Sequence, residues 1–390
     1  MRRFFIASAT GLATGYGLSR TLQAARELRQ PRGLFRKDAA AYGRARRCFM
    51  VLGMLRSTAT LGAFAYGAAE RLSGLIPIKA AWLRTICFTS VGLLADGLLE
   101  LPVYFIEDFT LERRYGLSNQ TPGAWLAQQI KGTLISAAFA APISGLFGLL
   151  LRKKPASWPW FASAALSPML LLANLIVPVF IAPLFNRFEE LQGPLEERLR
   201  ALASRYGVGN ADILRMDMSR QTKKANAYVA GVFNTHRIVV GDTLLQSFAD
   251  DEIGFVVAHE LGHYVARDTW RMIAVGQLAG SATMFVADAV MNASREDLWQ
   301  PQNIARLYFW MTFASQLLRP GLSWFSRSRE WAADRFACGA TKTPHVGAAA
   351  FERLRDVNLA QEEQPRWMEL LFSTHPSLKA RINALRSASS

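Results

Sequence analysis

Long apolar stretches separated by basic segments are the dominant pattern of this sequence. A membrane-spanning helix needs about 20 mostly apolar residues, because the bilayer core offers no water to backbone polar groups. Residues 132–151 and 158–184 meet this requirement without a single charged residue. Four further stretches carry one or two charges each and also predict spans: residues 48–69, 85–101, 272–293 and 307–325. The pattern predicts a mainly α, polytopic membrane protein.

Two stretches need a separate interpretation. Arg319-Pro320 interrupts residues 307–325, which we interpret as a helix that bends close to one membrane face. Residues 4–18 are short, follow two arginines and are rich in Gly and Ala, so a signal peptide competes with a first span. No convincing small-x-small cleavage site precedes the basic run, which favours the span. We therefore expect about seven transmembrane helices.

The distribution of basic residues predicts the orientation in the membrane. Residues 20–47 contain nine Lys and Arg against only two acidic residues. Because cytoplasmic loops carry an excess of Lys and Arg, we place this segment in the cytoplasm. Counting spans onward places residues 105–131, residues 185–269 and the C-terminal tail on the same side. The basic cluster at residues 152–154 then lies on the opposite side, against the rule.

Composition agrees with a membrane protein and excludes other classes. Hydrophobic residues make up 51% of the 390 residues and charged residues only 19%, which is too apolar for an ordinary soluble enzyme or a disordered chain. The net charge of +15 could suggest nucleic-acid binding, but the basic residues are concentrated between apolar stretches. We therefore expect no nucleic-acid partner. Three scattered cysteines exclude a disulfide scaffold.

Four charged residues fall inside the predicted spans: Arg56, Asp96, Glu100 and Asp288. A charge within the bilayer is costly in free energy. These side chains therefore pair with one another, face a hydrated interior, or lie near helix ends and extend to the interface. The sequence leaves these alternatives open.

Two polar segments, residues 185–269 and 326–390, together have the length of one compact domain. A helix pair at residues 270–325 separates them, and an N-terminal membrane region at residues 1–184 precedes them. We therefore expect one soluble domain built from two halves. The elements predicted in its first half are a helix at 189–206, a strand at 213–218, strands at 226–233 and 237–241, and a helix from Asp250 through His263.

The last of these helices carries the motif His259-Glu260-Leu261-Gly262-His263. Residues four apart on a helix project from one face, so two imidazoles at this spacing can hold one Zn²⁺ ion. Glu260 lies beside them and can reach water at the metal. Two unrelated histidines on an amphipathic helix are the alternative.

A catalytic zinc site needs a third protein ligand and leaves a fourth position for water. Glu330 is the best candidate, since Glu330 and Asp334 are again four residues apart on a predicted helix of the same domain. Asp334 could then accept a hydrogen bond from a ligand histidine and fix its tautomer. The alternative is a solvated helix face, because arginines surround these acids.

Three further histidines complete the set. His236, in a predicted hairpin turn, and His345, in a predicted loop, are expected at the surface. His375 lies near a helix start in the C-terminal tail, where it could approach a zinc site from the side.

Together these residues resemble the type I CAAX prenyl protease family of integral-membrane zinc metallopeptidases. The matching segments are 106–117, 181–186, 226–231, 240–245, 259–263, 330–334 and 375–381. They occur in this order, with a predicted pair of spans between the fifth and the sixth. Each segment is short, and their combination over almost the whole chain is specific.

The resemblance implies seven spans around a hydrated chamber and a gluzincin-like catalytic domain with a small β-sheet. By position, it implies that His259, His263 and Glu330 bind zinc and that Glu260 is the general base. It further implies roles for four other residues: Asp334 as an orienting or proton-donating acid, Asn226 in holding the substrate backbone, and His375 with Arg381 in stabilising the oxyanion.

The implied function is zinc-assisted hydrolysis of a peptide or protein, with lipidated or membrane-bound substrates among the candidates. Lys223-Lys224-Ala225 departs from the family pattern before Asn226, which concerns substrate entry and leaves the zinc chemistry intact. The compact length suggests a bacterial inner-membrane protein with a cytoplasmic catalytic domain. Two alternatives are a heat-shock-type protease for membrane-protein quality control and a non-catalytic membrane scaffold with a structural zinc.

Overall fold

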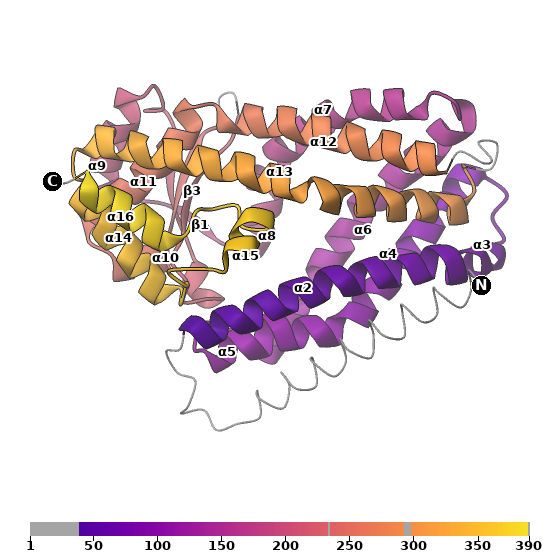
Figure 1. Cartoon of the computed structure of the whole chain (residues 1–390), viewed down its shortest axis with the longest axis horizontal. Coiled ribbons are helices and arrows are strands. Elements are labelled where there is room, and N and C mark those ends of the chain that lie inside the picture. The colour runs from indigo at the N-terminus through magenta and orange to yellow at the C-terminus, as the bar shows by residue number, and fades with distance from the viewer. Residues whose placement is uncertain (1–38, 233–234, 292–297, 389–390) are drawn as a thin grey trace.

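A computed structural model describes residues 39–232, 235–291 and 298–388 and shows two joined parts. Long helices form one part, and a four-stranded sheet with shorter helices forms the other (Figure 1). The predicted first span at residues 4–18 lies outside the described residues, as does most of the basic segment 20–47.

Five continuous helical segments are long and apolar enough to cross a membrane. The first joins α2 (Ala39–Ala63), η1 (Phe64–Ala68) and α3 (Ala69–Leu75), and the second joins α4 (Ala81–Tyr104), η2 (Phe105–Thr110) and α5 (Leu111–Arg114). The remaining three are α6 (Pro122–Lys153), then α7 (Trp158–Ile176) with η3 (Val177–Ile181) and α8 (Ala182–Phe185), and α12 (Asp268–Val290). The prediction of a mainly helical, multi-pass membrane protein is confirmed.

The stretch predicted at residues 307–325 forms part of α13 (Pro301–Thr341), a helix of 41 residues. The helix is unbroken at Pro320, although proline removes one backbone donor. It also continues past residue 325, so Glu330 and Asp334 lie on the same helix as the predicted span at residues 307–325. α13 is not among the five segments apolar enough to span by composition, so the count of seven stays a prediction.

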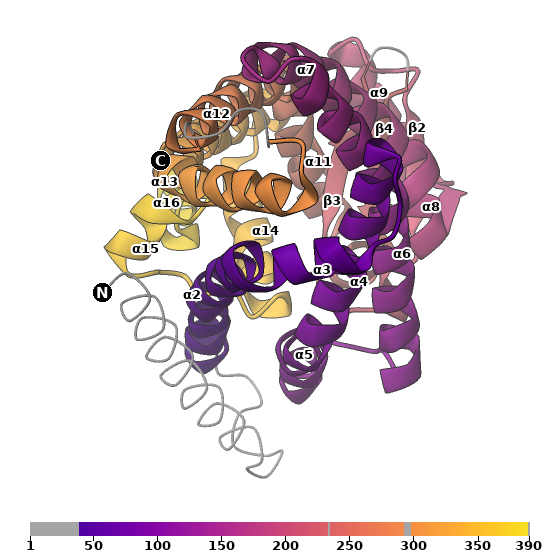
Figure 2. The ribbon, with the colours of Figure 1, turned by 90° about the vertical axis from the view of Figure 1, so that its right-hand side faces the viewer.

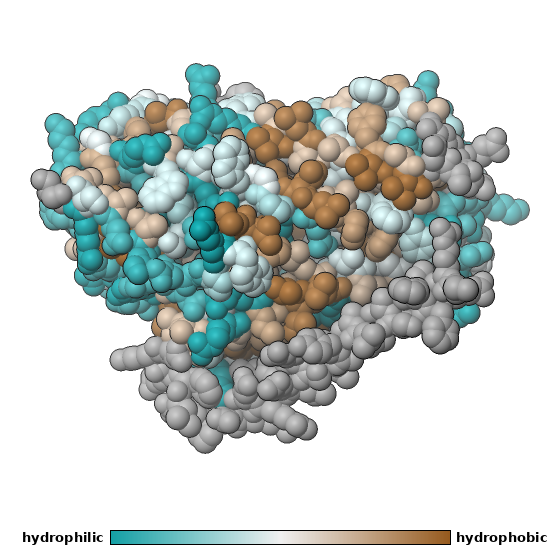
Figure 3. Space-filling view, viewed as in Figure 1, coloured by the Kyte–Doolittle hydropathy of each residue, from teal (hydrophilic) through white to brown (hydrophobic). Residues whose placement is uncertain are grey.

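The long helices are loosely packed against one another. In their most apolar windows, between 0 and 28% of the residues are buried within the protein. Seen from the end of the molecule, α7 and α12 lie toward the top of the view, and α2 and α5 lie toward the bottom (Figure 2). Apolar residues gather over the half that holds them, and polar residues cover the other half (Figure 3). The arrangement is that of a membrane part beside a water-exposed part.

The small sheet has the strand order β1-β2-β4-β3. Its strands are β1 (Phe188–Glu190), β2 (Asp212–Met216), β3 (Ala227–Ala230) and β4 (Arg237–Gly241). β2 and β4 are parallel, and the other two pairs are antiparallel. β3 is therefore an edge strand. The three strands that the sequence predicted are present: β4 has the predicted bounds, and β2 and β3 have shifted ends.

The predicted helix at residues 189–206 is wrong at its start. Residues 188–190 form β1, which pairs with β2, and the helix α9 (Pro194–Arg205) begins only at Pro194. Gly193 has a φ of 96°, a conformation that glycine adopts without strain and that turns the chain between the two elements. Pairing with β2 outweighs the local helical pattern of these residues.

The remaining short helices and the sheet together form the part of the protein that lies beside the long membrane helices. These helices are η4 (Met218–Arg220), α10 (Asp242–Ser247), α11 (Asp250–Val265), α14 (Pro344–Val357), α15 (Arg366–Leu371) and α16 (Leu378–Ser387). α11 lies at the centre, and its side chains Ile253, Phe255, Val257 and Leu261 are almost completely buried. This burial fixes the position of the helix that carries the HELGH motif.

Three of the four charged residues within the predicted spans have defined polar contacts. Arg56 on α2 forms an ion pair with Glu100 on α4. Asp288 accepts a hydrogen bond of 3.0 Å from the indole of Trp158. Asp96 is exposed and has no ion pair among the described residues. Pairing therefore accounts for Arg56 and Glu100.

We expect Glu100→Leu to lower the stability of the folded protein by about 3 kcal/mol, because it leaves the Arg56 charge unpaired between membrane helices. The measurement is thermal unfolding of the detergent-purified protein. The double variant Arg56→Leu/Glu100→Leu should recover most of the loss, and Asp96→Leu, one turn earlier on α4, should have little effect. An equal loss for Glu100→Leu and Asp96→Leu would contradict the ion pair's contribution.

Candidate metal centre and active site

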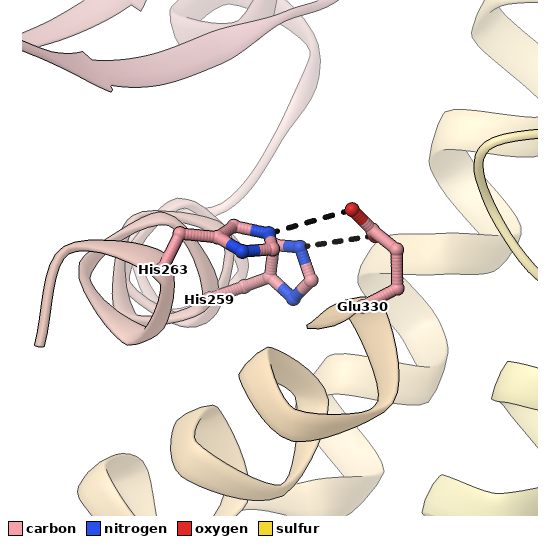
Figure 4. A group of neighbouring side chains, drawn as sticks. All are labelled: His259, His263 and Glu330. Atoms are coloured by element: carbon pink, nitrogen blue, oxygen red, sulfur yellow. Dashed lines mark ion pairs between the residues drawn. The ribbon is translucent and has the colours of Figure 1, made fainter. Parts of the chain in front are cut away.

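Three side chains from two helices meet at one point. His259 and His263 project from the same face of α11, and Glu330 projects toward them from α13 (Figure 4). One potential ligand atom from each residue lies within 4.8 Å of the other two. The Nε2 atoms of both histidines are 3.4 Å from the carboxylate oxygens of Glu330.

A carboxylate behind each imidazole fixes its orientation. The Nδ1 atom of His259 lies 2.9 Å from Asp334, and that of His263 lies 2.9 Å from Asp268. With its Nδ1–H donated to a carboxylate, each imidazole keeps the Nε2 lone pair free toward Glu330. Two nitrogen donors and one carboxylate are the donor set of a catalytic zinc site, and the carboxylate partners are typical of its surroundings.

The surroundings of the Glu330 carboxylate also indicate that the three side chains can bind a cation. Its Oε2 atom is buried and accepts no hydrogen bond within the described residues. Arg381 Nη1 and His259 Nε2 lie 3.3 and 3.4 Å from this oxygen, and a metal ion between it and the two imidazoles would give it a direct partner. The donor set, the tautomers and the position of this oxygen therefore fit a divalent metal ion.

The electrostatics of the group favour positive charge. Burial favours the neutral imidazole of His259, but the facing carboxylates of Asp334 and Glu330 outweigh it and raise its pKa to about 9. Burial would raise the pKa of the Glu330 carboxyl, yet the two imidazoles hold it far below its usual range. A divalent cation competes with protons for such a site, so metal binding releases protons.

Glu260 follows His259 on α11 and lies beside the group formed by His259, His263 and Glu330. Burial raises the pKa of its carboxyl above the usual value, while the neighbouring imidazoles oppose the shift. A glutamate with a raised pKa is suited to accept and later return a proton near neutral pH.

Gly262 allows α11 and α13 to approach closely enough for these contacts. A Cβ atom at this position would lie 3.0 Å from the Cα atom of Ala333 and 3.1 Å from the ring of Phe336. Such contacts are tighter than nine in ten Cβ contacts in proteins, so a larger residue would require α13 to move away by a few tenths of an ångström. The fourth residue of the HELGH motif thus has a packing reason.

Asp268 is a site residue that the sequence analysis missed. It lies at the first position of α12, five residues after His263, and the sequence analysis left it without a role near the end of the polar segment 185–269. Besides His263 it binds Arg329, whose Nε atom is 2.7 Å from Asp268 Oδ1. An acid one turn beyond the second histidine was the signal that could have identified it.

Asp334 is held from the other side by Arg381 on α16. The guanidinium donates two hydrogen bonds to the carboxylate, of 2.8 Å and 2.6 Å, and lies 4.2 Å above the ring of Phe351. Its Nη1 atom is 3.3 Å from Glu330. Burial opposes ionisation of Asp334, but His259 and Arg381 together lower the pKa of its carboxyl. Arg381 itself is only 6% exposed.

The other predicted site residues line a cleft of about 640 Å³, within the size range of small-ligand sites. Asn226, Glu260 and His375 all face this cleft. The Nε2 atom of His375 is 3.4 Å from Glu330, and its side chain is 62% exposed. His236, which packs on Tyr264, and His345, which is exposed, are not among the lining residues.

A membrane part of long helices, joined to a domain with two histidines and a glutamate at metal-binding distance, defines an integral-membrane metalloprotease. Residues 189–389 match the peptidase family M48, and residues 34–187 match the CAAX prenyl protease N-terminal region with five membrane helices. The chain belongs to peptidase family M48.

Individual relatives agree with this assignment. CAAX prenyl protease 1 of Saccharomyces cerevisiae is 33% identical over 54% of this chain and 48% of its own length. A CAAX prenyl protease 1 homolog of Oryza sativa is 31% identical over 79% of this chain and 74% of its own. The uncharacterized metalloprotease YhfN of Bacillus subtilis is 28% identical over 80% and 75%. The match thus spans about half of the yeast protein and three quarters of the other two.

The crystal structure of S. mikatae Ste24p has the same fold as this chain. The TM-score is 0.81 at 23% identity, and the similarity covers 99% of both chains. The two parts of the protein are therefore arranged as in that structure.

We expect Arg381→Met to lower stability by about 3 kcal/mol in protein treated with a chelator, because the buried Asp334 carboxylate loses its guanidinium partner. The matched control is Arg386→Met on the same helix, where an exposed pair with Glu352 should contribute at most about 1 kcal/mol. Thermal unfolding of both variants measures the difference. Equal shifts would mean that the buried pair adds no more than a surface pair.

Proposed function

We propose that this protein is a zinc endopeptidase of the membrane in which His259, His263 and Glu330 hold one Zn²⁺ ion. The observation that carries the proposal is the convergence of two imidazole Nε2 atoms and one carboxylate beside Glu260. Bound there, zinc supplies the Lewis acidity that activates water and polarises a peptide carbonyl.

The proposed chemistry needs a base and a donor from the chain itself. Glu260 takes a proton from the attacking water and passes it to the leaving amine. His375 faces the cleft and is positioned to donate a hydrogen bond to the carbonyl oxygen as its charge develops. Asp334 orients His259, and Arg381 contributes mainly by holding Asp334 and by balancing the charge of Glu330.

The edge strand β3 is the proposed binding surface for the substrate backbone. The N–H of Gly241 on β4 donates to the carbonyl of Asn226 at 3.0 Å. Because backbone groups alternate in direction along a strand, those of Ala227 and Val229 face the open edge. A peptide can add to this edge as a further antiparallel strand, and the exposed Asn226 side chain can bind its backbone.

Substrates are proposed to be peptides or proteins close to the membrane, with lipidated chains among them. Support comes from the long apolar helices that join the cleft-bearing domain and from relatives that are named CAAX prenyl proteases. A farnesylated peptide and its unmodified counterpart distinguish the two specificities. A strong farnesyl preference supports the CAAX type, and equal cleavage supports general quality control of membrane proteins.

We also propose a bacterial inner membrane with the catalytic domain on the cytoplasmic side. Arg152, in the basic cluster at residues 152–154, stacks on Trp299 next to the start of α13. This cluster therefore lies at the end of α13 that is far from Glu330, which supports a membrane face opposite to the catalytic domain. Ile304 near that start and Glu330 are 26 residues apart on one helix, which corresponds to about 39 Å. That length exceeds the bilayer core of about 30 Å.

Glu260→Ala should lower the rate of peptide hydrolysis by about 10²–10⁴-fold, the usual contribution of a general base, while zinc stays bound. Turnover of the matched peptides and the zinc content of the purified protein are the two measurements. Chelator treatment should abolish the wild-type activity. Hydrolysis that persists in the variant at the wild-type rate would refute Glu260 as the base.

Asp268→Asn should weaken zinc binding by about 10- to 100-fold, because His263 loses the carboxylate that orients it. A competition titration against a chelator of known affinity measures the change. Asp250→Asn, an exposed acid at the start of α11, is the control and should bind zinc like the wild type. Identical affinities for both variants would exclude an orienting role of Asp268.

A further inference from the structure

The buried side chain of Arg327 binds the backbone of the segment that leads to His375. Arg327 lies on α13 and is only 9% exposed. Its Nη1 atom donates hydrogen bonds of 2.6 Å to the Glu369 carbonyl and 2.7 Å to the Ser373 carbonyl, and its Nη2 atom donates one of 3.3 Å to the Leu370 carbonyl. A single guanidinium thereby binds three backbone carbonyls that lie close together in the sequence.

Two of these carbonyls belong to the last turn of α15, where carbonyl groups have no partner within the helix. Basic side chains often cap such a helix end, and here the cap comes from another helix. Arg327 makes no ion pair with an acidic residue of the ranges 39–232, 235–291 and 298–388. Its buried charge is therefore compensated by the carbonyls, and the carbonyls depend on it in turn.

His375 follows two residues after the last carbonyl that Arg327 binds. Its Nε2 atom lies 3.4 Å from Glu330, and its side chain is 62% exposed. Its Nδ1 atom lies 2.9 Å from the hydroxyl of Thr374, a neighbour that moves with it. Because so exposed a side chain is held by little packing, the position of its backbone decides where the imidazole lies.

The chain beyond His375 also depends on α15. The N–H of Ser377 donates a hydrogen bond of 3.2 Å to the side chain of Glu369, which lies on α15. The Ser377 hydroxyl accepts one of 3.3 Å from the N–H of Ala380 and so caps α16. Residues 373–377 are thus attached at both ends to the helix that Arg327 holds.

The same helix carries Arg327 and a proposed metal ligand. Arg327 and Glu330 are three residues apart on α13, which corresponds to about 4.5 Å along the helix axis. Any shift of α13 therefore moves the carboxylate and the support of the His375 segment together. This arrangement keeps the distance between the imidazole of His375 and the metal-binding group constant.

We infer that Arg327 is a positioning residue, which places His375 relative to the metal-binding group by holding α15 and the Ser373 carbonyl. The inference rests on the proposed function, in which His375 donates a hydrogen bond to the developing oxyanion. Such a donor acts at about 2.7–3.1 Å from the oxyanion. A misplacement of about 1 Å can lower a rate by up to about 10²-fold, so the support of His375 affects turnover.

A double-mutant cycle tests whether Arg327 acts through His375. Arg327→Met keeps an unbranched side chain and should lower kcat for peptide hydrolysis about tenfold, with KM and zinc content close to the wild-type values. His375→Ala alone should lower kcat about 10²-fold. Adding Arg327→Met to His375→Ala should change kcat by no more than about twofold, because the donor that Arg327 positions is already absent. A further tenfold loss in the double variant would overturn the inference.

Two variants serve as controls for this cycle. Arg335→Met removes the same charge from the same helix, but Arg335 is exposed and does not line the cleft, so kcat should stay at the wild-type value. Arg327→Lys keeps the charge with fewer carbonyls in reach and should lower kcat only about threefold. If Arg327→Met fails to fold, Arg327→Lys takes its place in the cycle, and a loss that persists in the His375→Ala background would again contradict the inference.

Hydrogen exchange in the metal-free protein gives a second measurement that needs no turnover. The N–H groups of Phe372 and Ser373 donate to the Met368 carbonyl, and that of Ser377 donates to Glu369. Arg327→Met should speed their exchange about tenfold and leave α11 unchanged. Unchanged exchange at these amides would overturn the inference. Faster exchange, together with no hydrolysis by the wild-type protein, would support the role of Arg327 in holding the segment and refute the proposed peptidase function.

Discussion

The close approach of α11 and α13 at Gly262 is the constraint on which the site depends. The Cα atom of Ala333 on α13 lies 3.0 Å from the place that a Cβ atom of residue 262 would take, and the neighbouring turns carry His259, His263 and Glu330 to one point. α11 is fixed by its buried face in the soluble core, while α13 extends from that core along the membrane helices. The contact between α11 and α13 thus connects the metal-binding side chains to the membrane part of the protein.

Each buried charged group of the site needs an oppositely charged or hydrogen-bonding partner, because burial in the protein removes it from water. Asp334 is shared between His259 and Arg381, and Asp268 between His263 and Arg329. Glu330 faces Arg381 at 3.3 Å and both imidazoles at 3.4 Å, although its Oε2 atom has no hydrogen bond within the described residues. A buried carboxylate beside two oriented imidazoles is well suited to bind a cation.

Local patterns predicted much of this protein, and contacts between distant segments account for what was missed. Apolar length identified the five membrane-type segments, and helical spacing identified His259, Glu260, His263, Glu330 and Asp334 as candidates. Residues 189 and 190 were read as helix because their pairing with β2 is set more than 20 residues later. The hydrogen bond from Arg327 to the carbonyl of Ser373, 46 residues apart, carries no local signal at all. Asp268 did have a local signal, its position five residues after His263.

X-ray absorption spectroscopy of the purified protein at the zinc edge tests the central claim most directly. The account predicts one zinc per chain with only nitrogen and oxygen neighbours, at about 2.0–2.2 Å, including two imidazoles. His263→Ala should remove one imidazole contribution from the spectrum or abolish binding. A sulfur ligand, or a spectrum with two imidazoles that is unchanged in His263→Ala, would contradict a centre built from His259, His263 and Glu330.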